Sequence, residues 1–466
     1  MLPAARSAPA WMLGLGFALG LGLAATASAG PSVYPTGVTR YDPAAAYNCD
    51  VLFGAFNPPN GKTYLIDMDG HVLHQWDKSG YPTRMLDPAR MQGAKGTIGV
   101  QLQDVPAGNG AGQIGLVPGV AGITRDLTVG FIDWSGNVTW QWGNQAPGGA
   151  ALQHHDWDLL PNGDVLLLAN KVGRLSGFGN RLMLDDVIYE VTRDGRIVWT
   201  WKASQHLAEF GFTAAQLKLL QRVSAQDYLH MNDMQVLGSN HWEHSGDQRF
   251  AADNILISSR NANFIAIISR SSGKIVWRIG PNFTPWPQPY AAAGVNKLPF
   301  KVDRLSGQHD ANMIGEGLPG AGNILVFDNE GEGGYPPATM PLINGSRVLE
   351  INPVTDEVVW QYTGRKDAFY SPFISSAQRL PNGNTLIDEG IDGRFFQVTR
   401  QGRIVWEYVS PYALAGGPGA APQAPFRLVY RIQAVPYGWV PIDAAHSERA
   451  VVPPGPADFH ITATGN

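Results

Sequence analysis

Alternating apolar and polar residues recur along this chain as short hairpins that end in tryptophan. In each hairpin, two arms with a period of two flank a tight turn, which is typical of paired β-strands. Glycine supplies the positive φ of the turn in all but one hairpin, where Asp356 replaces it. The hairpins are YLIDMDGHVLHQW (64–76), VGFIDWSGNVTWQW (129–142), VIYEVTRDGRIVWTW (187–201), FIAIISRSSGKIVWRI (264–279), RVLEINPVTDEVVWQY (347–362) and FFQVTRQGRIVWEY (395–408).

A second pattern precedes most of these hairpins and adds two strands to each. It is clearest in LLPNGDVLLLAN (159–170) and RLPNGNTLIDEG (379–390), where Pro-Asn-Gly forms the turn, and it is looser before the hairpins at 264–279 and 347–362. Two strands and a hairpin make a four-stranded antiparallel unit. Six such units placed radially form a β-propeller, which hides the sheet edges. We therefore predict an all-β fold, a six-bladed propeller of four-stranded antiparallel blades, with the tryptophans packed between blades. A sandwich or barrel would leave the matched hairpins coincidental.

The ends of the chain predict processing and one domain. An apolar run from Trp11 to Ala25, followed by small residues at 27–29, indicates a signal peptide over 1–29 and a periplasmic or secreted protein. Residues 30–466 then form a single propeller domain with a helical insertion near 204–225, for which Thr213 is the expected N-cap, and a Pro-rich C-terminal tail. The segment from Arg431 either closes the ring or lies on the surface.

Charge and cysteine content narrow the possible partners. The formal net charge is −5, and no run of Lys or Arg occurs, so neither nucleic acid nor, after signal cleavage, a membrane is an expected partner. Cys49 is the single cysteine, which excludes an intrachain disulfide. The fold must therefore be held by packing.

Three of the eleven histidines stand at what looks like one point of the repeat. His155, His230 and His309 each begin the string His-x-x-(Asp/Asn)-(Leu/Met) at the start of a unit's first strand. Because first strands line the central channel of a propeller, the three imidazoles should converge at one mouth of it. A histidine can also cap a blade by hydrogen bonding to its neighbour, but three in one register favour a functional site.

An arginine is expected beside these histidines. Arg260 ends the second strand of its unit, where the sister units carry Asn170 and Asn329. An arginine there is not needed for packing. The other histidines near these positions, His154, His241 and His244, lack the register, and we interpret them as structural or exposed.

At these residues the chain resembles the bacterial arylsulfotransferase family, whose members need no nucleotide sulfate donor. The most specific parts are HHDWDLLPNG, LHMND, NILISSRN and GQHDAN. The resemblance implies a six-bladed propeller and His309 as the nucleophile, with His155, His230 and Arg260 in support and no cofactor. Asp310 and Asn312 could orient the ring of His309.

The resemblance also implies a reaction and a set of partners. A sulfuryl group would pass from an aryl sulfate to a phenol by a ping-pong mechanism through N-sulfohistidine. Better-known members carry a separate N-terminal β domain used for dimerisation, and the first hairpin here leaves no room for it. We therefore expect a monomer or a weak homodimer.

Two other classes of function remain open at this point. Three histidines could hold zinc or copper with an open position for substrate, although a neighbouring arginine would repel the metal and no His-x-His or His-Glu-x-x-His spacing occurs. The propeller could also bind a ligand or partner without catalysis. A nucleotide-dependent sulfotransferase is disfavoured, since no phosphate-cradling glycine loop links a strand to a helix.

Overall fold

The computed structural model of the chain describes most of the sequence between residues 36 and 453. The described residues are 36–55, 61–80, 82–104, 126–224, 226–283, 298–331, 333, 345–364, 369–413, 427–442, 446 and 448–453. The predicted signal peptide at 1–29 lies outside these residues, as does much of the Pro-rich tail.

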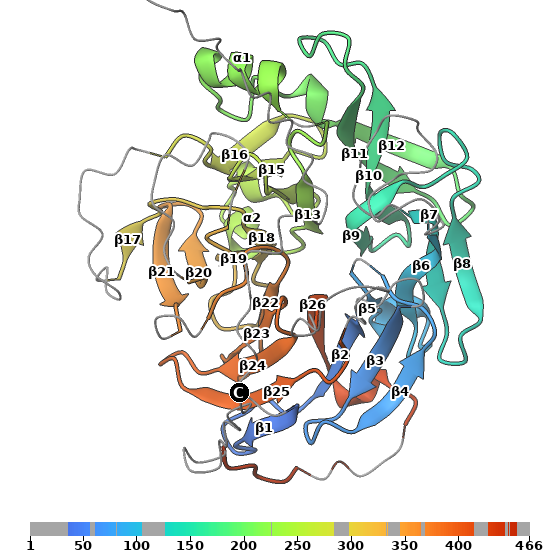
Figure 1. The fold of residues 1–466 in the computed structure, drawn as a ribbon, viewed down its shortest axis with the longest axis vertical. Coiled ribbons are helices and arrows are strands. Elements are labelled where there is room, and N and C mark those ends of the chain that lie inside the picture. Colours follow the sequence, from blue (N-terminus) through green and yellow to red (C-terminus); the bar gives the residue numbers. More distant parts are fainter. Residues whose placement is uncertain are drawn as a thin grey trace, which may run out of the picture.

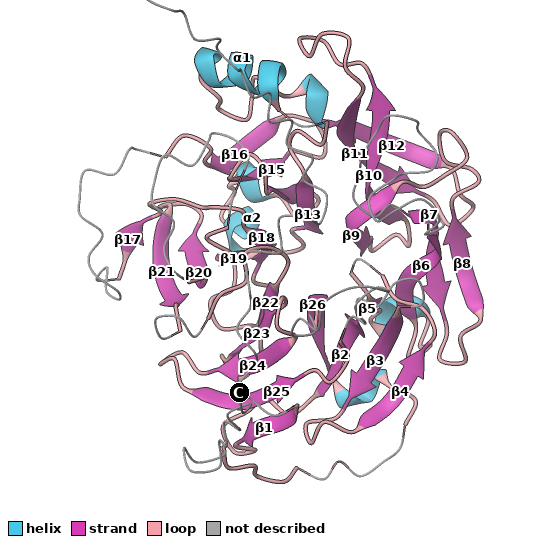
Figure 2. Ribbon diagram, viewed as in Figure 1, coloured by secondary structure: helices cyan, strands magenta, loops and turns pink. Residues whose placement is uncertain are grey.

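The strands pair antiparallel into five sheets arranged as a β-propeller (Figure 1), and helices are few (Figure 2). Four sheets hold four or five strands each, in the orders β26-β2-β3-β4, β13-β14-β15-β16, β17-β21-β20-β19-β18 and β1-β25-β24-β23-β22. Their strands are β1 (Gly37–Tyr41), β2 (Asp50–Ala55), β3 (Lys62–Ile66), β4 (Val72–Trp76), β13 (Met231–Val236), β14 (Ile255–Ser259), β15 (Phe264–Ile268), β16 (Ile275–Ile279), β17 (Phe300–Lys301), β18 (His309–Met313), β19 (Ile324–Asp328), β20 (Arg347–Asn352), β21 (Glu357–Tyr362), β22 (Ser376–Arg379), β23 (Thr385–Glu389), β24 (Arg394–Val398), β25 (Ile404–Val409) and β26 (Val429–Val435).

The fifth sheet departs from the expected set of six separate blades, because it holds eight strands. These are β5 (Arg84–Met85), β6 (Ile98–Asp104), β7 (Asp126–Ile132), β8 (Val138–Trp142), β9 (Gln153–Leu159), β10 (Val165–Gly173), β11 (Met183–Val191) and β12 (Ile197–Lys202). β5 to β8 and β9 to β12 form two four-stranded halves, and the single residue pair Asp126–Gln153 joins β7 to β9. By strand pairing, the prediction of six separate sheets is wrong, since this edge contact merges two of them.

The place of a strand within its sheet decides its sequence pattern. The outer strand β21 is buried at every second residue, namely Val358, Trp360 and Tyr362, and its other residues are partly exposed. Strand β11, which lies between β10 and β12, is buried at all nine positions. A strand covered on one face alternates, whereas one covered on both faces reads as a continuous apolar run. All six tryptophan hairpins of the sequence form antiparallel strand pairs.

The hairpin tryptophans connect neighbouring parts of the ring, as the sequence pattern predicts. Each indole N–H donates to a backbone carbonyl in or beside the turn of the following hairpin, and the last donates to the first. The pairs are Trp76 to Asp133, Trp142 to Gly195, Trp201 to Gly273, Trp277 to Pro353, Trp360 to Arg400 and Trp406 to Met68, at 2.7–3.1 Å. One side chain type at one repeat position thus links the hairpins in a closed circle.

Substitution of Trp406 by phenylalanine tests the contribution of this circle to stability. We expect Trp406→Phe to lower the free energy of unfolding by about 1–3 kcal/mol, because the buried carbonyl of Met68 would lose its donor. The measurement is the midpoint of urea unfolding. Trp140→Phe is the matched control, since the indole N–H of Trp140 has no hydrogen-bond partner among the described residues. Equal losses in the two variants would contradict the prediction.

Strands from both ends of the chain close the ring. β26 pairs with β2 and becomes the inner strand of the sheet that holds β3 and β4. β1 pairs with β25 at the outer edge of the last sheet. The segment around Arg431 therefore closes the ring rather than lying on the surface (Figure 1).

Helical segments lie between the strands. α1 (Ala214–Val223) falls within the expected insertion, and Thr213 caps it in a capping box with Gln216. Its Leu220 is buried against the core cluster. The others are α2 (His241–His244) and the 3₁₀ turns η1 (Pro88–Met91), η2 (Ala203–Gln205), η3 (Gln248–Phe250) and η4 (Tyr437–Trp439). None of the helices in the described ranges is long and apolar enough to span a membrane.

Candidate functional site

The pairing of the first strands gives each candidate histidine its place. Leu159 pairs with the first residue of β10, Met313 with that of β19, and Val236 with that of β14. His155 and His309 therefore occupy equivalent positions, four residues before these pairs. His230 stands six residues before Val236, so it lies two residues earlier than its supposed equivalents. The expectation of one shared register is wrong for His230.

His230 nevertheless contacts His155. The two rings meet edge to face, with centroids 4.6 Å apart. The Nδ1 atom of His230 lies 2.9 Å from Oδ2 of Asp227, so the carboxylate holds the Nδ1–H tautomer and leaves Nε2 as the acceptor atom. Both histidines have positive φ, 57° at His155 and 51° at His230. Non-glycine residues in this region are strained, and such strain concentrates at functional sites.

His154 belongs to this group as well. It is 2% exposed, and its Nδ1 lies 2.8 Å from Nδ1 of His155. On its other side, Nε2 lies 3.3 Å from Oδ1 of Asp186. The sequence analysis, which interprets His154 as structural or exposed, does not anticipate this contact with His155. The signal that could have found it is the His-His doublet itself.

His309 is buried, and its tautomer follows from its neighbours. Nδ1 lies 2.8 Å from Oδ1 of Asn329, whose amide nitrogen donates to the carbonyls of Ser371 and Ile374. The amide oxygen must then accept from His309, so Nδ1 carries the hydrogen. Nε2 bears the lone pair, and the Ile374 N–H donates to it at 3.2 Å. Burial, and then the positive charge of Arg260, lower the pKa of His309 well below its usual value.

Asn329, rather than Asp310 or Asn312, orients His309. Asp310 accepts from the Ala377 N–H, and Asn312 donates to the carbonyls of Asp310 and Ala377. Among the described residues, neither forms a hydrogen bond to the imidazole, so the expectation that they orient it is wrong. Position explains the difference, because Asn329 directly follows β19, two residues after Phe327, which pairs with His309.

Arg260 occupies the place that the sequence assigns to it. It follows β14 as Asn170 follows the equivalent point of β10 and as Asn329 follows β19. Its backbone N–H donates to the His230 carbonyl at 3.1 Å, and its Nη1 donates to Asn261 at 3.1 Å. The structure thus groups His155 with His230, and places His230 and Arg260 close enough to lower the pKa of His309.

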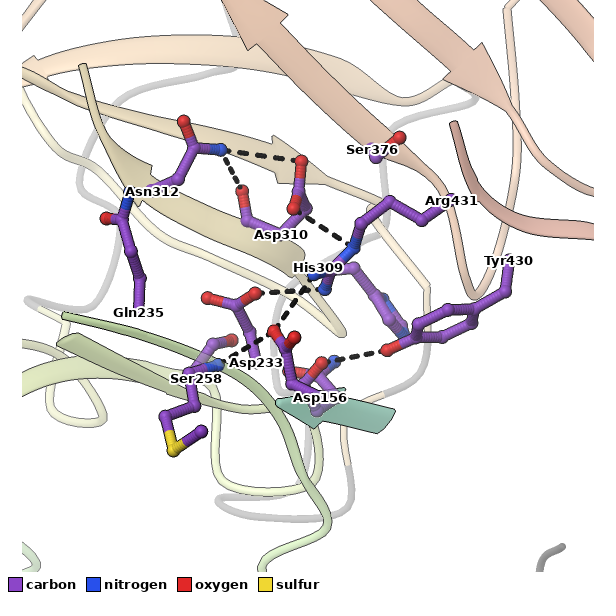
Figure 3. A network of polar contacts seen from close by, with 12 residues as sticks. Asp156, Asp233, Gln235, Ser258, His309, Asp310, Asn312, Ser376, Tyr430 and Arg431 are labelled. Carbon is purple, nitrogen blue, oxygen red and sulfur yellow. Dashed lines mark hydrogen bonds and ion pairs between the residues drawn. The ribbon is translucent and has the colours of Figure 1, made fainter. Parts of the chain in front are cut away.

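A buried arginine next to this group was not anticipated. Arg431 extends from β26 toward three aspartates of three different first strands (Figure 3). Its nitrogens lie 2.9 Å from Asp156, 2.9 Å from Asp233 and 3.1 Å from Asp310. Burial raises the pKa of Asp233 well above its usual value, and the neighbouring carboxylates add to this shift, whereas Arg431 opposes it. The sequence signal is the Asp that follows His155, Asn232 and His309.

A cavity of about 1050 Å³ lies against the Arg431 cluster. Asp233, Asp310 and Arg431 contribute to its lining, together with residues at the far ends of the first strands. None of the four predicted site residues lines it. Each aspartate directly follows a residue at the histidine level, so the cluster separates this cavity from the histidines.

The described part of the chain contains no set of ligands for the zinc or copper that the three histidines could have held. No three His, Cys, Asp or Glu side chains there are grouped so that they could hold a metal ion. The Nδ1 atoms of His230, His155 and His309 are instead engaged with Asp227, His154 and Asn329. His241 and His244 lie in α2, where His244 is more than half exposed and contacts Glu316.

Comparison with known proteins identifies the family. The family model described as Arylsulfotransferase (ASST) matches residues 60–406, about three quarters of the chain, so the chain belongs to the arylsulfotransferase family. Membership of this family supports a sulfotransferase enzyme with aryl sulfotransferase activity.

Solved structures match the chain only distantly. A protein of unknown function from Bacteroides caccae is 12% identical, with a TM-score of 0.43, over 83% of this chain and 98% of its own. A virginiamycin B lyase from Staphylococcus aureus is also 12% identical, with a TM-score of 0.33, over 78% of this chain and 88% of its own. No curated protein matches the chain. Function therefore rests on the family match and the site.

Proposed function

We propose that this protein moves a sulfuryl group from a phenolic sulfate ester to a phenolic acceptor in two half-reactions, with His309 as the covalent nucleophile. The observation that carries this proposal is the tautomer of His309. Its Nδ1–H is held by Asn329, so Nε2 carries a lone pair, and its lowered pKa agrees with a neutral ring. An imidazole in this state can attack sulfur without first losing a proton.

In the first half-reaction, a bond forms between Nε2 of His309 and sulfur while the bond from sulfur to the aryl oxygen breaks. The aryl group leaves as a phenolate, and the sulfuryl group stays as N-sulfohistidine. Sulfuryl transfer resembles phosphoryl transfer, in which positioning and charge stabilisation dominate. Arg260 can bind the sulfuryl oxygens, and the Ile374 N–H, released from Nε2, is a second donor beside them.

In the second half-reaction, an acceptor phenol loses its proton to a histidine and attacks the same sulfur. A phenol has a reference pKa of about 10, so it needs a base at neutral pH. His230, backed by Asp227, and His155, in contact with it, both present an Nε2 lone pair for this purpose. Attack of the phenolate oxygen restores the lone pair on His309 and releases the new aryl sulfate.

We also propose the setting in which this reaction occurs. The two halves of the eight-stranded sheet act as two blades, so that the ring has six, which the closed circle of six tryptophan bonds supports. The apolar run at 11–25 supports export to the periplasm or the medium. The protein acts there as a monomer or weak homodimer.

Turnover of p-nitrophenyl sulfate with phenol as the acceptor tests the proposed function. We expect p-nitrophenol release that depends on phenol, with phenyl sulfate as the product, and parallel lines in a ping-pong analysis. Metal analysis of the same preparation, and assay after chelation, should show activity that does not follow metal content. Release of free sulfate without an acceptor, or loss of activity on chelation with recovery on metal addition, would contradict the proposal.

A further inference from the structure

The side-by-side rings of His154 and His155 are unusual for neighbouring residues of one strand. Successive side chains of a strand point to opposite faces. Here the register of β9 against β10 shifts between Leu167 and Ala169, and His155 takes a φ of 57°. The local bulge turns both rings to the same side, at a cost of about 1–3 kcal/mol for a strained residue. Strain of this kind concentrates at functional sites, which favours a role for this contact in the site.

The hydrogen positions in this contact follow from Asp186. Its Oδ1 accepts from the amide of Asn170 at 2.9 Å, and its Oδ2 accepts from the Met231 N–H at 3.1 Å, so the carboxylate form is favoured. The negative charge of this carboxylate, 3.3 Å from Nε2 of His154, favours a hydrogen on that nitrogen over a lone pair, although the two atoms do not form a hydrogen bond. The lone pair of a neutral His154 ring is then on Nδ1, which accepts the Nδ1–H of His155 at 2.8 Å. In this tautomer Nε2 is the acceptor atom of the neutral His155 ring.

We propose that His154 is a positioning residue of the sulfuryl transfer, which holds His155 in the tautomer that accepts the proton of the phenol. This inference rests on the proposed function. His154 itself touches no reacting atom. When His155 takes the phenolic proton on Nε2, it becomes an imidazolium whose Nδ1–H remains bonded to His154, and Asp186 stabilises the pair from behind. The phenolate oxygen then forms its bond to sulfur as the bond to His309 breaks.

Two variants of His154 separate positioning from simple packing. His154→Leu removes the acceptor at similar size, whereas His154→Asn returns an oxygen near the place of Nδ1. His206→Leu is the matched control, because His206 also pairs with a carboxylate, Glu209, at 3.0 Å but lies outside the site. Thermal unfolding of each variant shows whether the fold is retained.

The two half-reactions are measured separately. The burst of p-nitrophenol without an acceptor reports donor cleavage at His309, and decay of the sulfo-enzyme with phenols of graded acidity reports transfer. For His154→Leu we expect the transfer rate with phenol to fall about 10²-fold, with donor cleavage near the wild-type rate. The loss should shrink as the acceptor becomes more acidic, because an ionised phenol needs no base. His154→Asn should recover part of the rate. Equal losses in both half-reactions, or a loss independent of acceptor acidity, would overturn the proposal.

A readout independent of activity accompanies these rates. In protein labelled with ¹⁵N-histidine, the resonances absent from a His155→Gln variant belong to His155. We expect them to show the Nδ1–H tautomer in the wild type and to lose it in His154→Leu. An Nε2–H tautomer in the wild type would refute the role of His154, even if the enzyme proved to be a sulfotransferase. A wild type without a p-nitrophenol burst would instead refute the proposed function while leaving the tautomer test intact.

Discussion

Replacement of His309 by alanine should abolish both donor cleavage and acceptor sulfation. Burial and the neighbouring Arg260 lower the pKa of His309, so its Nε2 carries a lone pair rather than a proton. Loss of a covalent nucleophile costs roughly 10⁴-fold or more in turnover. Arg260→Met should leave residual activity, with a loss of about 10²–10³-fold, because it removes a charge that stabilises the transferred group rather than the bond itself.

Mass spectrometry after incubation with donor alone locates the intermediate. We expect a sulfuryl adduct on the peptide that contains His309 in the wild type and none in His309→Ala. His71→Ala serves as the control, since His71 is exposed and pairs with Asp67 in a surface turn. An adduct on another peptide would assign the nucleophile to another residue, and full activity of His309→Ala would refute the covalent mechanism at His309.

The largest loss of stability is expected from Arg431→Met. This change would leave Asp156, Asp233 and Asp310 buried around an uncharged side chain. Breaking a buried ion pair by removing one partner costs about 3–5 kcal/mol, and here three carboxylates from three sheets lose one common partner. We expect a fall in the thermal unfolding midpoint that is larger than that of any single tryptophan variant.

A surface arginine provides the comparison for Arg431. Arg403 pairs with Asp42 at 2.8 Å, but both side chains are substantially exposed. Arg403→Met should therefore leave the unfolding midpoint almost unchanged, because exposed ion pairs contribute little. If Arg431→Met unfolded at the same temperature as Arg403→Met, the cluster would not join the sheets as we infer. Partial recovery of the midpoint in Arg431→Met at acid pH, where the three carboxylates are neutral, would support the inference.

The hairpins of this fold were predictable because each is a local signal. Alternation, a glycine turn and a terminal tryptophan lie within about fifteen residues, and all six hairpins form as the pattern predicts. The merging of two blades was not predictable, since it depends on one residue pair, Asp126–Gln153, at a strand edge. Ring closure by β26 was left open because its partner β2 lies near the other end of the chain.

The site was predictable only as far as the repeat reaches. Aligning the repeats finds His155, His309 and Arg260. It misplaces His230 by two residues, because the sequence aligns Met234 with Leu159, whereas the strand pairing aligns Val236 with Leu159. Asn329 was named only as a sister of Arg260, although it is the residue that fixes the tautomer of His309. Arg431 and Asp156 are 275 residues apart, and no periodic pattern connects them.

The closure of the ring by its last strand sets an order on assembly. β2 needs β26 as its inner neighbour, and β26 is the last of the strands in the described part of the chain to emerge during synthesis. The same strand carries Arg431, so the three aspartates of β9, β13 and β18 receive their common cation at the same moment. A nascent chain that stops before residue 429 therefore holds an open ring in which these aspartates lack the guanidinium of Arg431. Closure of the ring and the arrival of the cation that these aspartates share are one event.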